Sequence, residues 1–433
     1  MNQARKASSG LTTSENRAFP PFKFSKHYAT MLPLPASAPI YDYERILKRC
    51  KRNIQGLRNG EVALRFLDHM SALGLSTARV AKYGTKLVVL LRVIDKDLKD
   101  VSREDVERVV AWINGKPHKE WTKHDSKLVL RKIVQYAKQG NCAKGTPLPP
   151  EVSWISLVVK EKDFRATPEN LLTQDEVAAM VKAASNTRDR ALIYVLFEAA
   201  LRPGELLTMT VGGVDFKEDY CLICVNGKTG IKRIPLVVSF KPLLEWLRDH
   251  PCKDDRNAPL WCSLSSNRVG ERLSYQHFRL RIKLLAEKAG LKKDVWPYLY
   301  RHSTLTAMAK VFTEAKLEQF AGWTYGSKMT RRYVHFSARD LEDAVLELHG
   351  LRQPQRDEGL AKLVECPRCG NKNPFGNVRC GFCGYILDRR LAEETEQKNG
   401  ERDLEIQNRL QRLEQTISSL LHNQTETQPP PSP

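Results

Sequence analysis

The stretch around Tyr333 gathers residue types that could make a nucleophile. Lys328, Arg331 and Arg332 precede this tyrosine, and His335 follows two residues after it. A phenol with a pKa of about 10 is almost fully protonated at neutral pH, so a tyrosine nucleophile needs nearby cations or a base. The stretch offers both. Alone it is a weak signal, because a tyrosine beside basic residues is more often a packed side chain with cations reaching to solvent.

Three upstream segments each place one cation in a defined local setting. Arg202 precedes a proline and Glu205, which suit the first turn of a helix. Lys228 falls between two β-branched runs that are typical of a hairpin. Arg301 lies at the start of a helical pattern and is followed by His302. Taken singly, these residues are explained as well by a helix-start ion pair, a solvated turn residue and a packed histidine.

The ordered set of these residues resembles the catalytic domain of the tyrosine recombinases, the family of phage integrases and chromosome-resolving recombinases. The motif Gly-Trp-Thr-Tyr-Gly-Ser-Lys-Met, followed by Tyr-Val-His, is most similar to the corresponding motif of the archaeal integrases of that family. The resemblance covers roughly residues 170–350. An ordered set is far more specific than any one of its members.

The resemblance implies a role for each member of the set. Tyr333 is the implied nucleophile, Arg202 and Arg301 are the two arginines, Lys228 is the hairpin lysine, and Trp323 takes the His/Trp position. Where the family usually has His-x-x-Arg, this chain has Tyr298-Leu-Tyr-Arg301, so Tyr298 stands at the position of the usual histidine. The general base is therefore left open. Glu205, His302 and His335 are expected to support the site.

The implied chemistry is phosphoryl transfer with no cofactor for catalysis, neither metal nor ATP. Two guanidiniums can meet the charge on the non-bridging oxygens through bidentate hydrogen bonds, which a lysine cannot copy. Lys228 would protonate the departing 5′-oxygen as a general acid. Trp323 would pack against the site and donate its indole N–H. A 3′-phosphotyrosyl intermediate keeps the energy of the broken bond for rejoining.

Length and charge agree with a DNA-binding protein of several domains. The chain has 433 residues, with 70 Lys and Arg against 50 Asp and Glu, which gives a net charge of +20. Such a charge favours a polyanionic partner, nucleic acid first and an acidic membrane second. No run of eighteen apolar residues occurs, and the first forty residues lack the apolar region of a signal peptide. We therefore expect no membrane contact and a cytoplasmic, nucleoid-associated location.

Four of the ten cysteines form two Cys-x-x-Cys pairs, Cys366 with Cys369 and Cys380 with Cys383. This spacing predicts one structural zinc in a zinc ribbon, because four thiolates leave no open position for catalysis. Cys221 and Cys224 repeat the spacing, but an offset of three in a strand puts them on opposite faces, so they are interpreted as core residues.

The expected fold class is multidomain and mainly α: a helical core-binding domain, a mixed α+β recombinase catalytic domain, a small zinc ribbon and a short coiled coil. The predicted parts, in order, are a flexible basic arm (1–40), the helical DNA-binding domain (41–145), a linker (146–170), the catalytic domain (171–351), a spacer (352–365), the zinc ribbon (366–388), a helix or coiled coil (389–423) and a disordered tail (424–433).

One helix of the predicted core-binding domain has a cationic face. At 100° per residue, Lys123, Lys127, Arg131 and Lys138 fall within about 80° of one another, opposite an apolar face. This face is either exposed to solvent or in contact with DNA, and the net charge of the chain favours the contact with DNA.

The C-terminal helical pattern has apolar residues four and three apart, at Ile406, Leu410, Leu413, Ile417 and Leu420. This spacing indicates a short coiled-coil seam, with packing onto the ribbon as the alternative.

Three functions are compatible with these residues. The favoured one is a site-specific recombinase or integrase that acts on double-stranded DNA as a dimer to tetramer. The second is DNA relaxation of the type IB topoisomerase kind, against which the small hairpin-and-helix layout argues. The third is a non-catalytic DNA-binding regulator on the same fold, supported only by Tyr298 in place of histidine. The sequence leaves open the target site, the direction of recombination, and whether cleavage occurs in cis or in trans.

Overall fold

The computed structural model describes most of the chain. The described residues are 40–159, 168–227, 230–335, 345–346, 349–351 and 360–425. Nearly all of the predicted arm, most of the predicted spacer and most of the predicted tail lie outside them. Lys228 and the side chain of His335, both expected at the site, lie outside them too.

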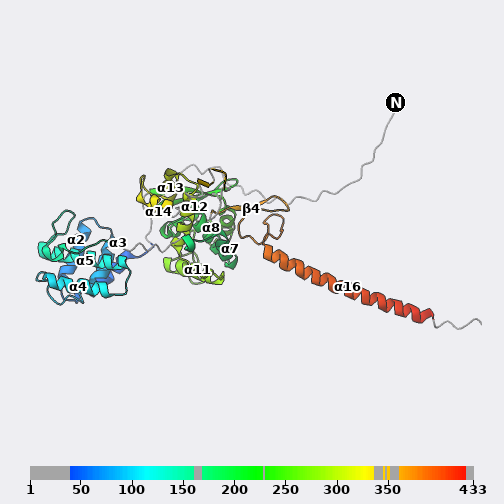
Figure 1. Cartoon of the computed structure of the whole chain (residues 1–433), viewed down its shortest axis with the longest axis horizontal. Coiled ribbons are helices and arrows are strands. Elements are labelled where there is room, and N and C mark those ends of the chain that lie inside the picture. The colour runs from blue at the N-terminus through cyan, green and yellow to red at the C-terminus, as the bar shows by residue number, and fades with distance from the viewer. Residues whose placement is uncertain are drawn as a thin grey trace, which may run out of the picture. The chain divides into compact units, whose positions relative to one another are not determined.

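The first part of the described chain is a bundle of helices (Figure 1). They are α1 (Tyr43–Gln55), α2 (Gly60–Ala72), α3 (Thr77–Leu90), α4 (Arg103–Gly115), α5 (Glu120–Gln139) and the short α6 (Pro150–Ser153). Apolar faces from these helices share one core, as spacing of three and four residues requires. Val152 and Ile155 are buried in this core, so it extends into the stretch predicted as a linker.

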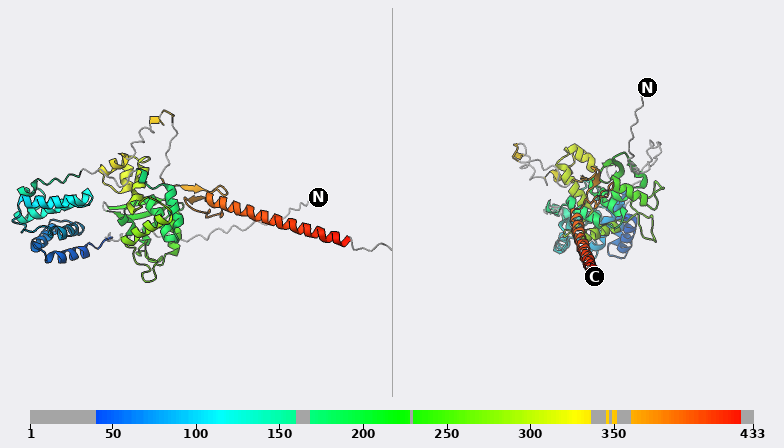
Figure 2. Two further views of the ribbon diagram at one scale, coloured as in Figure 1. Left: turned by 60° about the horizontal axis from the view of Figure 1, so that its bottom comes forward. Right: turned by 90° about the vertical axis from the view of Figure 1, so that its right-hand side faces the viewer.

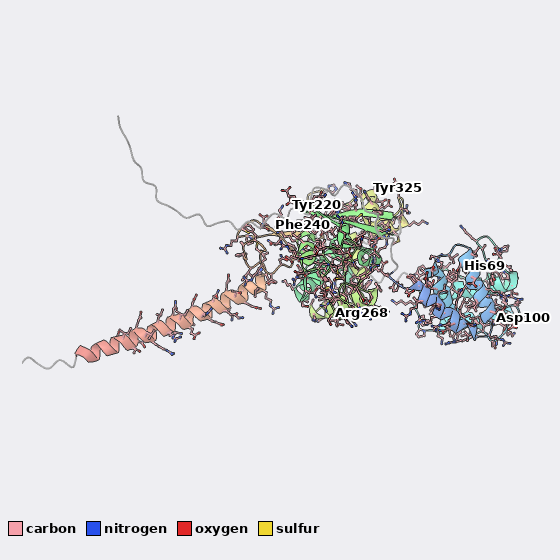
Figure 3. All side chains as sticks on the ribbon, turned by 180° about the vertical axis from the view of Figure 1, so that it is seen from behind. His69, Asp100, Tyr220, Phe240, Arg268 and Tyr325 are labelled. Carbon is pink, nitrogen blue, oxygen red and sulfur yellow. The ribbon has the colours of Figure 1, made fainter. Side chains whose placement is uncertain are left out.

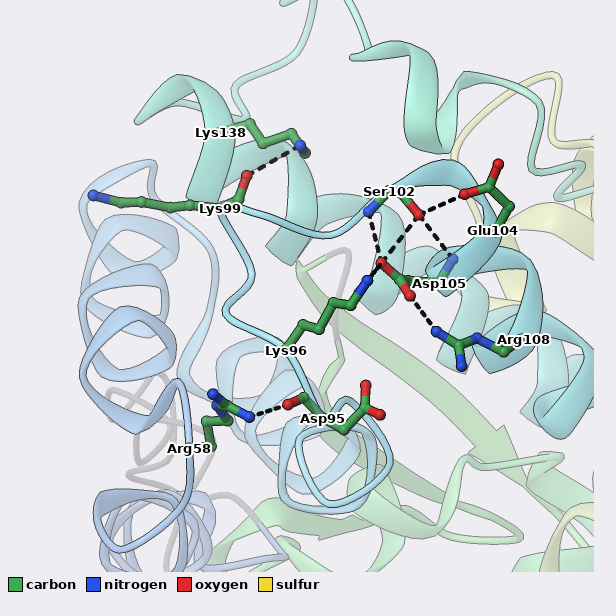
Figure 4. A network of polar contacts seen from close by, with 9 residues as sticks. All are labelled: Arg58, Asp95, Lys96, Lys99, Ser102, Glu104, Asp105, Arg108 and Lys138. Atoms are coloured by element: carbon green, nitrogen blue, oxygen red, sulfur yellow. Dashed lines mark hydrogen bonds and ion pairs between the residues drawn. The ribbon is translucent and has the colours of Figure 1, made fainter.

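The start of α4 is fixed by a network around Asp105 (Figure 4). Its carboxylate accepts hydrogen bonds from Lys96 Nζ and from the backbone N–H of Ser102, each at 2.9 Å, and it pairs with Arg108. Ser102 caps the helix in return, in a reciprocal capping box. Lys96 and the N–H of Ser102 hold the pKa of Asp105 far below its usual range. The carboxylate therefore stays ionised and keeps the cap in place.

The second part is mixed α+β. Its helices are α7 (Gln174–Ala183), α8 (Thr187–Ala199), α9 (Pro203–Leu207), α10 (Phe240–Asp249), α11 (Tyr275–Lys288), α12 (Pro297–Ala309), α13 (Glu314–Ala321) and α14 (Lys328–His335). Thr173 and Glu176 form the expected capping box at the start of α7. Every residue of α8 from Ala191 to Phe197 is buried, which makes this helix the centre of the domain's core. Figure 2 shows the same elements from two further sides.

A three-stranded antiparallel sheet accompanies these helices. It runs β1 (Val214–Phe216), β2 (Cys221–Gly227) and β3 (Gly230–Leu236), in that order. Gly227 at the end of β2 pairs with Gly230 at the start of β3. The predicted hairpin is thus present.

The two strand cysteines differ in burial: Cys221 is fully buried, whereas Cys224 is partly exposed. This matches the opposite faces expected from their offset of three.

The last described part holds the four cysteines and a long helix. Strands β4 (Leu363–Glu365) and β5 (Lys372–Pro374) pair antiparallel, and α16 (Arg389–Thr425) follows as one uninterrupted helix (Figure 1). Ile406, Leu410, Leu413 and Ile417 on α16 are each more than half exposed. The expected fold class is confirmed: a mainly helical first region, a mixed catalytic domain, a four-cysteine cluster and a long helix.

Candidate active site

Arg202 is fixed at the junction between α8 and α9. It is the N-cap residue of α9, and Pro203 occupies the first helical position. The carboxylate of Glu205 accepts hydrogen bonds from the Arg202 backbone N–H at 3.0 Å and from its Nη1 at 2.6 Å. Glu205 is only 3% exposed. A side chain at Gly227 would place its Cβ 2.8 Å from Glu205 Oε1, so glycine lets the hairpin approach this carboxylate.

Lys232 on β3 meets the same carboxylate. Its Nζ lies 2.9 Å from Glu205 Oε2, and its side chain is 10% exposed. Burial lowers the pKa of Lys232 to about 8, against the opposing effect of Glu205. Burial alone would raise the pKa of Glu205, but Lys232 and Arg202 outweigh it and lower the pKa. Glu205 is therefore an ionised, buried anchor for two cations.

Arg301 is buried in the first half of α12. Its guanidinium donates to the carbonyl oxygens of Ala200 at 2.6 Å and Ala321 at 2.8 Å. Burial lowers the pKa of Arg301 to about 10, and nearby Arg202 acts in the same direction, so the group stays charged at neutral pH.

The backbone of Ala200 is held in an unusual conformation beside Arg301. Its φ is +49°, in the left-handed region that a residue with a Cβ seldom adopts. Strain of this kind persists where surrounding contacts fix it, often at functional sites. Here the carbonyl of the strained residue is a hydrogen-bond partner of the arginine.

Tyr333 on α14 lies in a stack of rings. Its Oη is 3.0 Å from His302 Nδ1 on α12. Its ring centroid is 5.4 Å from that of Trp323 and 5.9 Å from that of His302. Arg301 Cζ lies 5.7 Å from the centre of the Trp323 ring. Tyr333 is 2% exposed, so its hydroxyl is held by protein groups in this state.

His302 was expected only as a supporting residue, yet it is the group in hydrogen-bond contact with Tyr333. When Nδ1 carries no proton, the phenol O–H donates to it. Tyr298, at the usual histidine position, is 40% exposed, and its ring centroid lies 6.4 Å from that of His302. Partial burial raises the pKa of Tyr298. The structure thus places an imidazole, that of the residue after Arg301, beside the Tyr333 hydroxyl.

Glu318 on α13 was missed by the sequence analysis. Its carboxylate accepts hydrogen bonds from the backbone N–H groups of Gly326 at 3.1 Å and Ser327 at 2.8 Å, and from Thr330 Oγ1 at 2.9 Å. It is 5% exposed. These bonds fix the start of the helix that carries Tyr333. A glutamate within a helix gives no sequence signal of such contacts.

Lys232 was not among the residues expected at the site from the sequence. The alternation of buried and exposed residues along β3 is the sequence signal that could have identified Lys232 as an inward-pointing residue. Lys232, Ile234 and Leu236 are two residues apart and share the less exposed face of β3, while Arg233 and Pro235 are exposed. A lysine in register with two core residues points inward.

The four cysteines Cys366, Cys369, Cys380 and Cys383 converge. Their sulfur atoms all lie within 4.8 Å of one another. The Phe382 backbone N–H, at 3.4 Å, and Asn373 Nδ2, at 3.6 Å, donate toward Cys380 Sγ. Four convergent thiol groups with N–H donors around them fit a tetrahedral metal ion such as zinc.

The expected cationic face of α5 is partly engaged within the helical bundle. Lys123 pairs with Glu120 at 2.9 Å. Lys138 pairs with Glu151 at 2.9 Å and donates to the Lys99 carbonyl at 3.1 Å. Lys127 and Arg131 are half-buried, and burial lowers the pKa of Arg131. The four cations thus differ in how far internal contacts already occupy them.

The fold and the site together define a class: a mixed α+β domain that brings two arginines and a buried tyrosine together from separate elements. Residues 170–339 match the family model described as the phage integrase family.

Curated relatives are tyrosine recombinases. XerA of Pyrococcus horikoshii is 29% identical over 174 residues, 40% of this chain and 59% of that protein. XerC of Xylella fastidiosa is 32% identical over 155 residues, 33% of this chain and 47% of that protein. XerA of Saccharolobus solfataricus is 22% identical over 304 residues, 67% of this chain and 93% of that protein. The two alignments of higher identity thus span about half of the relatives' own length.

A solved structure shares the fold. The XerH site-specific recombinase, bound to palindromic difH substrate in a post-cleavage complex, matches with a TM-score of 0.51 and 17% identity. The match covers 73% of this chain and 99% of that one. At this identity the likeness concerns the fold. Within the described residues, no helix is both long and apolar enough to cross a bilayer.

Proposed function

We propose that this protein is a site-specific DNA recombinase or integrase that breaks and rejoins double-stranded DNA through a 3′-phosphotyrosyl intermediate. The observation that carries the proposal is the contact of 3.0 Å between Tyr333 Oη and His302 Nδ1, in a ring stack that also meets Arg301. The match of residues 170–339 to the phage integrase family supports it.

The residues divide the chemistry as follows. His302 takes the phenol proton while Tyr333 Oη attacks the phosphorus, in the role of base that Tyr298 left open; the 3.0 Å contact supports this assignment. Arg202 and Arg301 stabilise charge on the non-bridging oxygens. Glu205 holds Arg202 in position. Trp323 packs against the nucleophile, and Tyr298 lines the edge of the site. The same groups in reverse rejoin the strand to a 5′-hydroxyl.

Two other functions carry less support. Type IB topoisomerase-like relaxation would use the same chemistry, but the similar curated proteins named above are recombinases. A non-catalytic regulator rested on the missing histidine at position 298. The imidazole of His302 beside Tyr333 removes that reason.

The remaining parts have proposed roles as well. The four-cysteine cluster holds one structural zinc. The exposed apolar stripe of α16 pairs with a second copy of this chain in parallel. If Leu410 and Ile417 are the a positions of a heptad, Arg409 falls at g and Glu414 at the following e, and these positions attract in parallel pairs. An assembly of two to four protomers on DNA and a cytoplasmic, nucleoid-associated location stay predictions.

The test is a covalent adduct on DNA. Wild-type protein is incubated with supercoiled plasmid, and protein linked to DNA is measured after denaturation, together with relaxation. Tyr333→Phe removes only the nucleophilic oxygen, so we expect no adduct and DNA binding within a few-fold of wild type. Tyr325→Phe is the matched control, because Tyr325 is 93% exposed on the loop before α14 (Figure 3). An ordinary adduct yield from Tyr333→Phe would reject the proposal.

A further inference from the structure

The four-cysteine module sends one side chain into the core of the catalytic domain. Phe375, in the loop between the two cysteine pairs, is buried in the same core as α8. Its ring meets the rings of Tyr194 and Phe197 edge to face, and the Tyr194 hydroxyl donates to its carbonyl. Tyr194 and Phe197 are three residues apart, so they lie on one face of α8. The module therefore packs against the last two turns of this helix.

The end of α8 also carries contacts that fix the two arginines of the site. Carbonyl groups in the last turn of a helix have no partner within that helix. Thr304 on α12 donates to the Phe197 carbonyl. Arg301 on the same helix donates to the carbonyl of Ala200, the C-cap residue of α8, at 2.6 Å. Arg202 follows two residues later as the N-cap of α9. The last turn of α8 thus joins the two elements that carry the arginines.

These contacts form one continuous path from the module to the arginines. Phe375 packs on Phe197, whose carbonyl is bound by α12 one turn after Arg301. Packed protein interiors have few voids, so they transmit a displacement instead of absorbing it. An error of about 1 Å in the place of a catalytic group can cost about 10²-fold in rate. A change in the packing of Phe375 should therefore be felt at the arginines.

A second anchor holds the end of α8 from another element. The Glu198 carboxylate accepts hydrogen bonds from the backbone N–H groups of Val237 at 2.7 Å, Val238 at 3.0 Å and Ser239 at 2.7 Å, at the start of α10. This anchor involves no residue of the module. We therefore expect a weakened Phe375 contact to shift the end of α8 without unfolding it.

We propose that the four-cysteine module is a positioning element of the active site, and that Phe375 is the positioning residue that aligns Arg202 and Arg301 through the end of α8. This inference rests on the proposed function, because the two arginines act on the reacting phosphate in that function. Phe375 acts only through other residues. Its ring sets where the two guanidiniums lie, and the rate of strand cleavage depends on that alignment.

The experiment uses Phe375→Leu, which removes the ring and keeps an apolar side chain. Cleavage is measured in a single turnover at saturating DNA, with DNA affinity as the second measurement. We expect cleavage about 10–10²-fold slower than wild type and an affinity within a few-fold of it. Ile282→Val is the matched control, at a fully buried position of α11 in the same core. It should lower stability to a similar extent and cleave at the wild-type rate.

A double-mutant cycle separates positioning from a general loss of folded protein. Lysine at position 202 cannot make the bidentate contact for which Arg202 must be aligned. If Phe375 acts through Arg202, the slowing caused by Phe375→Leu should be several-fold smaller in the Arg202→Lys background. A loss of folded protein would slow cleavage by the same factor in both backgrounds.

Hydrogen exchange gives a measurement that does not depend on activity. Residues 198–205 span the junction of α8 and α9, and amide exchange there is followed by mass spectrometry on the full chain. Exchange should be faster in Phe375→Leu and unchanged in Ile282→Val. If Phe375→Leu does not fold, or Arg202→Lys does not cleave, Tyr194→Phe decides. It removes only the hydroxyl that bonds the Phe375 carbonyl, and it should show faster exchange and slower cleavage to a smaller extent.

The outcomes are distinct. Cleavage by Phe375→Leu at the wild-type rate, equal slowing in the two backgrounds, or unchanged exchange at residues 198–205 overturns the inference and leaves the proposed function standing. No adduct from wild type overturns the proposed function and the inference with it.

Discussion

The imidazole in contact with Tyr333 comes from the residue after Arg301 on α12. The helix turns by about 100° per residue, so His302 faces a different side from Arg301. That side meets Tyr333 Oη at 3.0 Å, whereas Tyr298 lies one turn earlier and is 40% exposed. The Tyr333 hydroxyl therefore has an imidazole in contact, although Tyr298 stands where the family usually has a histidine.

We expect His302→Gln to slow adduct formation by about 10²–10⁴-fold, the usual contribution of a general base. Glutamine keeps a hydrogen-bonding side chain at the site but cannot accept and hold a proton. The rate is measured in single-turnover cleavage, with DNA binding as the second measurement. His277→Gln, on the exposed side of α11, is the matched control and should cleave at the wild-type rate. A His302→Gln protein as fast as wild type would return His302 to a packing role.

The expectations for Tyr333, Arg202 and Arg301 rest on local settings that can be recognised in the sequence. Proline after Arg202 and the periodicity after Arg301 are local signals. The contacts between His302 and Tyr333, and between Lys232 and Glu205, join residues far apart in the chain. They depend on how α14 meets α12 and on how the hairpin meets α9, which periodicity does not encode. The spacing of the cations on α5 could be read from the sequence, but the ion pairs that Lys123 and Lys138 make within the helical bundle could not be predicted from it.

At the scale of elements, the four-cysteine module is joined to the catalytic core. Phe375, between the two cysteine pairs, is 2% exposed, and its ring centroid lies 5.1 Å from Tyr194 and 5.9 Å from Phe197. Tyr194 Oη donates to the Phe375 carbonyl. A Cβ on Gly376 would lie 3.0 Å from Ala178, so this close approach requires glycine. The module therefore contributes a core side chain to the domain that holds the candidate active site.

Two further contacts hold the module on the catalytic domain. Lys241 Nζ on α10 donates to Asn371 Oδ1 at 2.9 Å and to the Lys372 carbonyl at 2.7 Å. Lys182 on α7 pairs with Asp388. The cysteine spacing predicted the metal-type cluster, but nothing in it indicated that the loop between the pairs would enter another domain's core.

We expect Phe375→Ala to lower the free energy of unfolding of the catalytic domain by about 3–5 kcal/mol, as for a large aromatic removed from a core. Denaturant unfolding is followed by the fluorescence of the buried Trp246 and Trp261, which lie in the same core. Phe382→Ala is the matched control, because Phe382 is 71% exposed in the same module and should change stability by no more than about 0.5 kcal/mol.

Removal of the metal should act in the same direction. If zinc fixes the loop that carries Phe375, a chelator should lower the midpoint of the tryptophan transition in wild type and have a smaller effect in Phe375→Ala. A chelator that removes zinc and leaves the wild-type transition unchanged would show that the loop keeps its place without the metal.

At the scale of the whole molecule, the net charge of +20 predicts that the affinity for DNA depends strongly on ionic strength. Each phosphate neutralised by a cation releases condensed counterions, so log affinity falls with log salt by about 0.9 per neutralised phosphate. Some of the cations are already engaged inside the fold. Lys138 is the clearest case on α5, with its ion pair to Glu151 and its hydrogen bond to the Lys99 carbonyl.

We therefore expect two different outcomes along the same helix. Neutralising Lys123, Lys127 and Arg131 together should flatten the salt dependence of DNA affinity by about 0.9 for each phosphate that no longer meets a cation, up to ~2.7. Lys123 belongs with this group because its pair with Glu120, three residues earlier on the helix, is weak enough to exchange for a phosphate. Lys138→Ala should leave the slope unchanged and lower the stability of the helical bundle instead. Both are measured on the full chain, by titration at several salt concentrations and by thermal unfolding. An unchanged slope in the triple variant would make this face a solvated one, and a flatter slope in Lys138→Ala would show that DNA draws that lysine away from its internal partners.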